Sequence, residues 1–200
     1  MVEEGYTVPP FATPPVPPMH VGFDDRSGGM SPSGPVLVRR MSDLRGLYAD
    51  QAAWTAALES DDVVYEVASS PVPELEGELP QSITTILPGR VGGEFHMTKG
   101  HMHTRPRGEI YLGLSGLGGL LLFDGERPQW IEMRPGSIGY IPPHWAHRSV
   151  NVGDEPYRFL AVYPGDSGHD YGWVAEHGMG HRVFHGSGGP ELRPFTFPAG

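Results

Sequence analysis

Short runs of apolar and β-branched residues, separated by glycine and proline, occupy most of the chain between residues 63 and 163. Runs of this length and composition are typical of β-strands and do not suit long helices. The 29 glycines and 22 prolines in the 200 residues provide the turns between them. The expected strands span residues 63–67, 82–87, 94–97, 100–103, 109–114, 119–123, 129–133, 137–141, 146–152 and 157–163. This spacing predicts an all-β fold, a sandwich or a barrel, in a single domain.

The segments that flank these runs have a different composition. Residues 1–35 contain three Pro-Pro pairs followed by Gly, Ser and Pro, which favours an extended or disordered arm. Residues 51–58 are good helix formers after a candidate N-cap, Asp50, so we expect one or two short helices in all. Residues 186–200 are rich in Gly and Pro and lack periodicity. We therefore expect an arm over 1–35, a β domain over 36–185 and a flexible tail over 186–200.

Two histidine clusters suggest a metal site. His101 and His103 are two residues apart, so both point to the same face of an extended strand and can reach one ion. Glu109 and His147 would complete the set. Three imidazoles and one carboxylate suit a divalent ion such as iron, manganese, nickel or zinc, and they leave coordination positions free for a substrate. The pattern favours catalysis over a structural role.

Composition and charge exclude several classes of protein. The net charge of −10 argues against non-specific nucleic-acid binding, which depends on clustered Lys and Arg. The longest apolar run is too short and too interrupted to span a bilayer. The absence of cysteine excludes disulfides and thiolate ligands. An anionic small molecule is still compatible, because local cations could attract it near the metal: Arg90, Lys99, Arg105 and Arg107.

Alternation along the expected strands places polar residues on one face. Glu109, Tyr111 and Gly113 share a face, while the apolar residues between them point to the other. Phe159, Ala161 and Tyr163 share a face on the last expected strand. Since small barrels often enclose one ligand, these residues are expected to line a cavity beside the metal.

The histidine clusters belong to two longer motifs. The sequence resembles the cupin superfamily, whose first motif has His-x-His, then Glu, then Gly, and whose second has Gly, Pro, His and Asn. The matching residues are His101, His103, Glu109 and Gly116, then Gly136, Pro142, His147 and Asn151. The resemblance implies a jelly-roll-like β-barrel or sandwich with one metal site.

A closer resemblance covers about residues 36–183. Thr98-Lys-Gly-His101-Met-His103, Glu109-Ile-Tyr111 and Gly168-His169-Asp170-Tyr171-Gly172 are similar to the cupin-type glucose-6-phosphate isomerase family. The resemblance implies one divalent ion per subunit, most often iron, held by His101, His103, Glu109 and His147. It implies sugar-phosphate binding by Thr84, Thr98, Gly100, Tyr163 and Tyr171, and catalysis involving Glu109, Tyr111 and His169.

The implied reaction interconverts glucose 6-phosphate and fructose 6-phosphate. We expect a cis-enediol route in which Glu109 removes a proton next to a carbonyl and returns it to the neighbouring carbon. A carboxylate that binds metal is a weaker base, so a metal-assisted hydride shift is the competing route. Two other functions stay open: a metal-dependent cupin oxygenase and a non-catalytic sugar-binding cupin.

Three further expectations concern partners and additional sites. His177, His181 and His185 would align on a helix, but Gly178 and Gly180 make that helix, and a second metal site, unfavourable. The apolar stretch at residues 36–40 could extend a sheet in a second copy, so a homodimer is expected. The lack of cysteine and of an export signal favours the cytoplasm.

Overall fold

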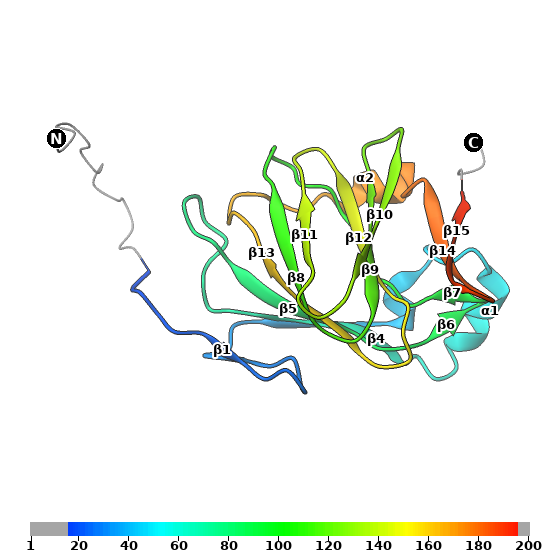
Figure 1. Cartoon of the computed structure of the whole chain (residues 1–200), viewed down its shortest axis with the longest axis horizontal. Helices are drawn as coiled ribbons and strands as arrows, with labels where there is room; N and C mark the ends of the chain where they lie inside the picture. Colours follow the sequence, from blue (N-terminus) through cyan, green and yellow to red (C-terminus); the bar gives the residue numbers. More distant parts are fainter. Residues whose placement is uncertain (1–15, 196–200) are drawn as a thin grey trace.

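The computed structural model describes residues 16–195 and consists mainly of two antiparallel sheets (Figure 1). The larger sheet has the strand order β11-β8-β13-β5-β4-β3. Its strands are β3 (Val36–Arg40), β4 (Val63–Ser69), β5 (Gln81–Ile86), β8 (Glu109–Ser115), β11 (Ile138–Ile141) and β13 (Tyr157–Val162). The second sheet, β10-β9-β12, contains β9 (Gly118–Phe123), β10 (Pro128–Met133) and β12 (Ala146–Asn151). The predicted all-β, jelly-roll-like fold is confirmed.

Smaller elements lie around the two sheets. A four-stranded sheet contains β6 (Arg90–Val91), β7 (Glu94–Phe95), β14 (His181–Gly186) and β15 (Gly189–Pro194). β1 (Gly22–Phe23) and β2 (Met30–Ser31) form a short ladder within the expected arm. The helices are η1, a 3-10 helix (Met41–Leu44), α1 (Gln51–Ala57) and α2 (Tyr171–His177). Within residues 16–195, no helix has the length and apolar character needed to cross a membrane.

Both α-helices begin at an aspartate. The Asp50 side chain accepts hydrogen bonds from the backbone N–H groups of Ala52 and Ala53, as expected for an N-cap. Trp54 of α1 is buried, and its indole N–H donates to the Met41 carbonyl at 3.0 Å. In α2, Asp170 accepts from the Trp173 N–H at 3.0 Å.

The connection from β8 to β9 passes between the two sheets. Gly116 makes the turn at φ 74°, and the chain leaves the larger sheet to begin β9 in the second sheet. The connection is therefore not a hairpin, although the glycine-rich run at 116–119 has the composition of a hairpin turn. The physical reason is packing: a Cβ on Gly118 or Gly119 would overlap the rings of Tyr157 and Trp130. These glycines let the second sheet lie close against aromatic rings.

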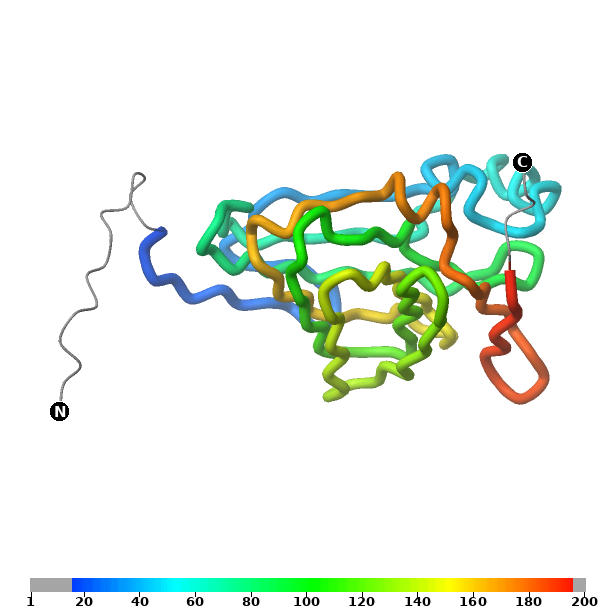
Figure 2. The backbone as a smooth tube through the Cα atoms, turned by 90° about the horizontal axis from the view of Figure 1, so that it is seen from above, coloured from blue at the N-terminus to red at the C-terminus, as the bar shows by residue number. Residues whose placement is uncertain are grey.

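Two expected boundaries differ from the structure. The run at 100–103 is not a sheet strand; His101 and Met102 make isolated bridges to His147 and Asp170. Residues 189–194, expected in the flexible tail, form β15 and pair with β14. The glycines at 186–189 form the turn of that hairpin. Figure 2 shows the hairpin, in red, at the end of the molecule far from residues 16–20, in blue. Residues 1–15 and 196–200, the ends of the expected arm and tail, lie outside the described residues.

Candidate active site and metal centre

The four predicted metal ligands meet inside the fold. His101 and His103 lie on the segment between β7 and β8, Glu109 begins β8, and His147 lies on β12. Their ligand atoms are all within 4.8 Å of one another. Glu109 Oε2 lies 3.3 Å from His103 Nε2 and 3.1 Å from His147 Nε2. The structure thus brings together a set that the chain separates by 46 residues.

The chemistry of these atoms fits a cation. The Nε2 atoms of the three histidines and Glu109 Oε2 are buried, and among the described residues they have no partner outside this group of four atoms. His103 Nδ1 lies 2.8 Å from the Arg107 carbonyl, and His147 Nδ1 lies 3.2 Å from the Trp145 carbonyl. Because a carbonyl only accepts, each Nδ1 carries the proton and each Nε2 presents a lone pair to the centre. Four buried lone-pair groups that face one another are costly unless a cation lies between them.

The ionisation of the ligands follows from their surroundings. Burial raises the pKa of Glu109, but hydrogen bonding and attraction from His103 and His147 outweigh burial and lower it overall. Burial lowers the pKa of His101 well below its usual value. For His103, burial lowers the pKa, whereas interactions with Glu109 and the Arg107 carbonyl raise it overall. A proton on His103 and a divalent ion are therefore alternatives at this centre.

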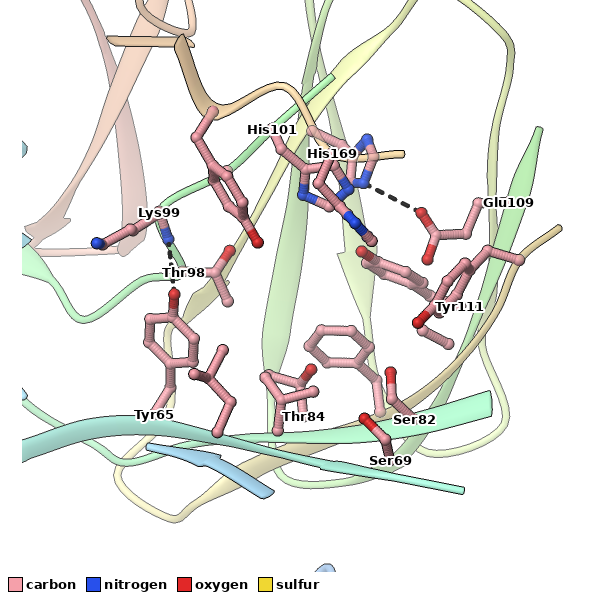
Figure 3. Close-up of a pocket in the computed structure, with 18 of the residues that line it drawn as sticks. Tyr65, Ser69, Ser82, Thr84, Thr98, Lys99, His101, Glu109, Tyr111 and His169 are labelled. Atoms are coloured by element: carbon pink, nitrogen blue, oxygen red, sulfur yellow. Dashed lines mark hydrogen bonds and ion pairs between the residues drawn. The ribbon is translucent and has the colours of Figure 1, made fainter. Parts of the chain in front are cut away.

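A cavity of about 230 Å³ opens beside the four ligands. Figure 3 shows His101 and His169 at one side of it, Glu109 and Tyr111 at another, and Thr84 on the strands that form its floor. Apart from His103, which faces Glu109 from outside the lining, every predicted site residue lines this cavity. These residues are Thr84, Thr98, Gly100, His101, Glu109, Tyr111, His147, Tyr163, His169 and Tyr171.

Two of the residues expected to bind phosphate have free donors. Thr98 Oγ1 accepts a hydrogen bond from the Ser149 N–H at 3.1 Å, which leaves the threonine O–H available to donate. Gly100 has φ 76°, and within residues 16–195 its N–H donates to no acceptor. Thr84 extends from β5 into the same cavity. Hydroxyl and amide donors of this kind suit an anion.

Tyr163, which is also expected to bind the phosphate, already makes a hydrogen bond within the protein. The Tyr163 hydroxyl donates to Glu74 Oε1 at 2.9 Å, and burial and this carboxylate raise the pKa of the tyrosine. Glu74 also lines the cavity, so it places a negative charge beside the expected phosphate donors. The sequence offered no signal for Glu74, because it lies on a loop without periodicity.

Three aromatic groups surround the remaining part of the cavity. The His169 ring is centred 4.5 Å from the His101 ring and stacks on Tyr171 at 6.2 Å. Tyr111 is buried, and burial followed by the charge of Glu109 raises its pKa well above the ordinary value. Its ring packs on Phe159 at 4.4 Å. The predicted alternation on β8 and β13 is confirmed, because Glu109, Tyr111, Phe159 and Ala161 all line the cavity.

Sequence reasoning missed several lining residues on β4 and β5. Ser82 lies two residues before Thr84 on the same face, and Ser69 is its cross-strand partner. Tyr65 lies further along β4, where its hydroxyl is 3.5 Å from the Lys99 N–H. The signal that could have found them is the alternation that starts from Thr84.

The expected group of local cations is largely wrong. Lys99 is the one member of the four that lines the cavity. Arg105 and Arg107 form ion pairs with Asp166, at 2.9 and 2.7 Å. Arg90 lies over the Phe95 ring. The three arginines that sequence proximity assigned to the site therefore contact Asp166 or the Phe95 ring instead of the cavity.

Comparisons with known proteins agree with this site. The sequence profile described as glucose-6-phosphate isomerase matches residues 38–192. The chain is 48% identical over 171 residues to a glucose-6-phosphate isomerase of Thermococcus kodakarensis, covering 84% of this chain and 90% of that protein. It is 47% identical over 174 residues to that of Pyrococcus horikoshii, with 86% and 92% covered. It is 43% identical over 164 residues to that of Sinorhizobium medicae, with 80% and 76% covered.

Similarity to solved structures is weaker. An oxalate decarboxylase of Lactobacillus farciminis is 21% identical, covers 54% of this chain and 30% of its own, and has a TM-score of 0.43. This structural overlap is partial and does not bear on the chemistry of the site. The family profile covers most of the chain, and the relatives match along most of their own length. On these grounds the chain belongs to the glucose-6-phosphate isomerase family.

Proposed function

We propose that this chain interconverts glucose 6-phosphate and fructose 6-phosphate and depends on one divalent metal ion. The observation that supports it is the set of four buried ligand atoms with no partner outside the set, at the edge of a cavity in a member of this family. His101, His103, Glu109 and His147 would hold the ion. Iron is our first expectation, and manganese, nickel and zinc also suit three imidazoles and a carboxylate. When bound, such an ion polarises a carbonyl oxygen of the substrate.

Glu109 has two oxygens with different surroundings, and this difference supports its use as a base. Oε2 faces His103 and His147. Within residues 16–195 the contacts of the Glu109 carboxylate are made by Oε2 and not by Oε1, and the side chain lines the cavity. One oxygen can therefore serve the metal centre while the other approaches the substrate. This division lets one carboxylate contact both the metal and the substrate, although metal binding at Oε2 still weakens Oε1 as a base.

The remaining residues orient the open-chain sugar in this proposal. Thr84, Thr98 and Gly100 donate to the phosphate, with Tyr163 once it leaves Glu74. Tyr111, His169 and Tyr171 contact the sugar hydroxyls. Glu109 Oε1 takes the proton from carbon 2 of the aldose to give a cis-enediol and returns it to carbon 1, while the hydroxyl proton moves from oxygen 2 to oxygen 1.

A coupled assay with fructose 6-phosphate tests this function. We expect activity that is lost on chelation and restored by a divalent ion. Glu109→Ala should abolish it, and Glu109→Gln should lower kcat by about 10²- to 10⁴-fold. Glu66→Gln, an exposed site on β4, is the matched control and should keep full activity. Absence of metal-dependent isomerisation in the wild type would contradict the proposal.

Solvent exchange separates the two candidate routes. In deuterated water the enediol route should place deuterium at the exchanging carbon of the product. A hydride shift would leave that carbon without solvent deuterium. The second result would count against proton transfer by Glu109 while leaving the isomerase activity intact.

We also propose a homodimer in the cytoplasm. β3 is the last strand of its sheet and pairs on one side with β4 within the described residues. Its apolar side chains are exposed: Val36 by 58%, Leu37 by 38% and Val38 by 39%. An exposed apolar edge strand favours pairing with a second copy. Sedimentation of wild type and Val38→Lys tests this, because a shared edge should be weakened by the charge.

A further inference from the structure

Arg148 is a buried cation next to a metal ligand. It follows His147 on β12. The residue is 6% exposed, and it does not line the cavity beside the four ligands. Its Nε and Nη2 both donate to the Lys99 carbonyl, at 3.2 and 2.7 Å. It forms no ion pair among residues 16–195, because the nearby Glu94 is paired with Arg182 at 3.0 Å. Its guanidinium is charged at neutral pH.

Such a group is expensive to bury for packing alone. A guanidinium removed from water without a carboxylate loses hydration that one carbonyl only partly replaces. The side chain also fills the space behind Gly100, where an added Cβ would lie 3.1 Å from Arg148 Cβ and 3.2 Å from Nε. The arrangement therefore points to a task at the segment from Thr98 to Gly100.

From Thr98 to His101, every residue except Gly100 is hydrogen-bonded to a residue of β12. The Thr98 N–H donates to the Ser149 carbonyl at 2.9 Å, and the Ser149 N–H donates to Thr98 Oγ1 at 3.1 Å. The His101 N–H donates to the His147 carbonyl at 3.1 Å. Between these anchors, the Lys99 carbonyl is held by Arg148.

The Lys99 carbonyl and the Gly100 N–H belong to one peptide plane. In a trans peptide these two groups point in opposite directions. Arg148 does not line the cavity, so the carbonyl that it holds is directed away from the lining, and the Gly100 N–H on the opposite side of the peptide is then directed toward the cavity that Gly100 lines. A cation on the carbonyl also polarises the peptide unit, which makes its N–H a stronger donor.

We propose that Arg148 is a positioning residue for phosphate binding. It acts through the Lys99 peptide plane, which it orients so that the Gly100 N–H faces the phosphate group of the substrate. This inference rests on the proposed function for the identity of the substrate, but anion binding at Gly100 can be measured without turnover.

The test compares Arg148→Lys, which keeps the charge and loses the two-pronged contact, with Arg148→Met, which loses both. KM for fructose 6-phosphate and the inhibition constant of inorganic phosphate should rise about tenfold or more in Arg148→Lys. The rise should be larger in Arg148→Met. kcat should fall less than KM rises, and metal content should stay at the wild-type level. Arg158→Lys is the matched control, because Arg158 is half-buried on β13 and outside the cavity lining.

Two results would overturn the inference. One is a folded, metal-loaded Arg148→Lys with unchanged KM and unchanged phosphate inhibition. The other is loss of metal and kcat at unchanged KM, which would mean that Arg148 acts through His147. If the wild type does not isomerise the sugar, phosphate-induced thermal stabilisation still tests the inference: in Arg148→Lys the same stabilisation should need about tenfold more phosphate than in the wild type.

If neither variant folds, the wild type carries the test alone. In zinc-loaded protein labelled with ¹⁵N, inorganic phosphate should shift the Gly100 amide resonance and the Arg148 Nε–H resonance together. A Gly100 amide that does not move at saturating phosphate would contradict the inference.

Discussion

At the scale of single residues, Tyr163 lines the cavity, as the prediction requires, but its hydroxyl is already bonded to another side chain. Its hydroxyl donates to Glu74, 89 residues away in sequence, at 2.9 Å. A phosphate that binds at the same hydroxyl has to compete with that carboxylate. We therefore expect Glu74 to lower the affinity of the cavity for dianions, while its hydrogen bond orients the tyrosine.

Neutralising Glu74 should strengthen phosphate binding. We expect Glu74→Gln to lower KM for fructose 6-phosphate roughly three- to tenfold, because a like charge near the phosphate is removed. The glutamine keeps an acceptor for Tyr163, so the hydroxyl stays oriented. Steady-state kinetics measure the effect, with Glu76→Gln on the same loop as the control. A raised KM in Glu74→Gln would contradict competition and indicate that the carboxylate helps binding.

The sequence predicted the residues whose positions depend on local spacing. His101 and His103 are two apart, and Glu109 and Tyr111 share a face of one strand, so alternation alone placed them together. Glu74 could not be found in this way. Its position depends on the close approach of its loop to Gly165, where a Cβ would overlap the Leu75 backbone. Contacts between distant loops leave no period in the sequence.

At the scale of elements, β9 lies close to aromatic rings because of its first two residues. Gly119 faces the Trp130 ring on β10, and the six residues of the strand are buried. β9 also pairs with β12, which carries His147. Gly118 thus lets β9 approach the Tyr157 ring of the larger sheet, and Gly119 leaves room for Trp130 within its own sheet.

A methyl group at Gly119 should disturb this packing. We expect Gly119→Ala to reduce the free energy of unfolding by about 1–3 kcal/mol, because the new Cβ overlaps the Trp130 ring. Gly188→Ala, where an added Cβ meets nothing within 4 Å, should change it by less than about 0.5 kcal/mol. Urea denaturation measures both. Equal effects at the two positions would show that close packing at β9 is not the cause.

The strands themselves were predictable from their apolar residues and turns, but their assignment to sheets was not. Gly116–Gly119 has the composition of a hairpin turn, and only the rings of Tyr157 and Trp130 reveal why the chain changes sheet there. β15 was missed for the opposite reason, because its glycines form a tight turn where composition suggested flexibility.

At the scale of the whole molecule, stability should depend on pH through His96. This side chain is 8% exposed, and its Nδ1 lies 3.2 Å from the Leu87 carbonyl. Burial lowers its pKa from the ordinary value of 6.5. The unfolded chain therefore binds a proton near pH 6.5 that the folded chain does not, so stability falls as pH decreases below 6.5 and reaches its full value above it.

The measurement is the free energy of unfolding from urea titrations between pH 5 and 8, with saturating metal. Stability of the wild type should rise with pH across this window. His96→Gln should show a shallower rise, whatever its stability at pH 8. Parallel slopes for the two proteins would contradict a role for His96.

The four donor atoms come from both layers of the fold. Glu109 belongs to the six-stranded sheet, and His147 belongs to the three-stranded sheet. An ion held between them would act as a cross-link through the middle of the protein. The affinity for the metal would then depend on the distance between the two sheets. Core substitutions that separate the sheets by a fraction of an ångström should weaken metal binding before they unfold the chain.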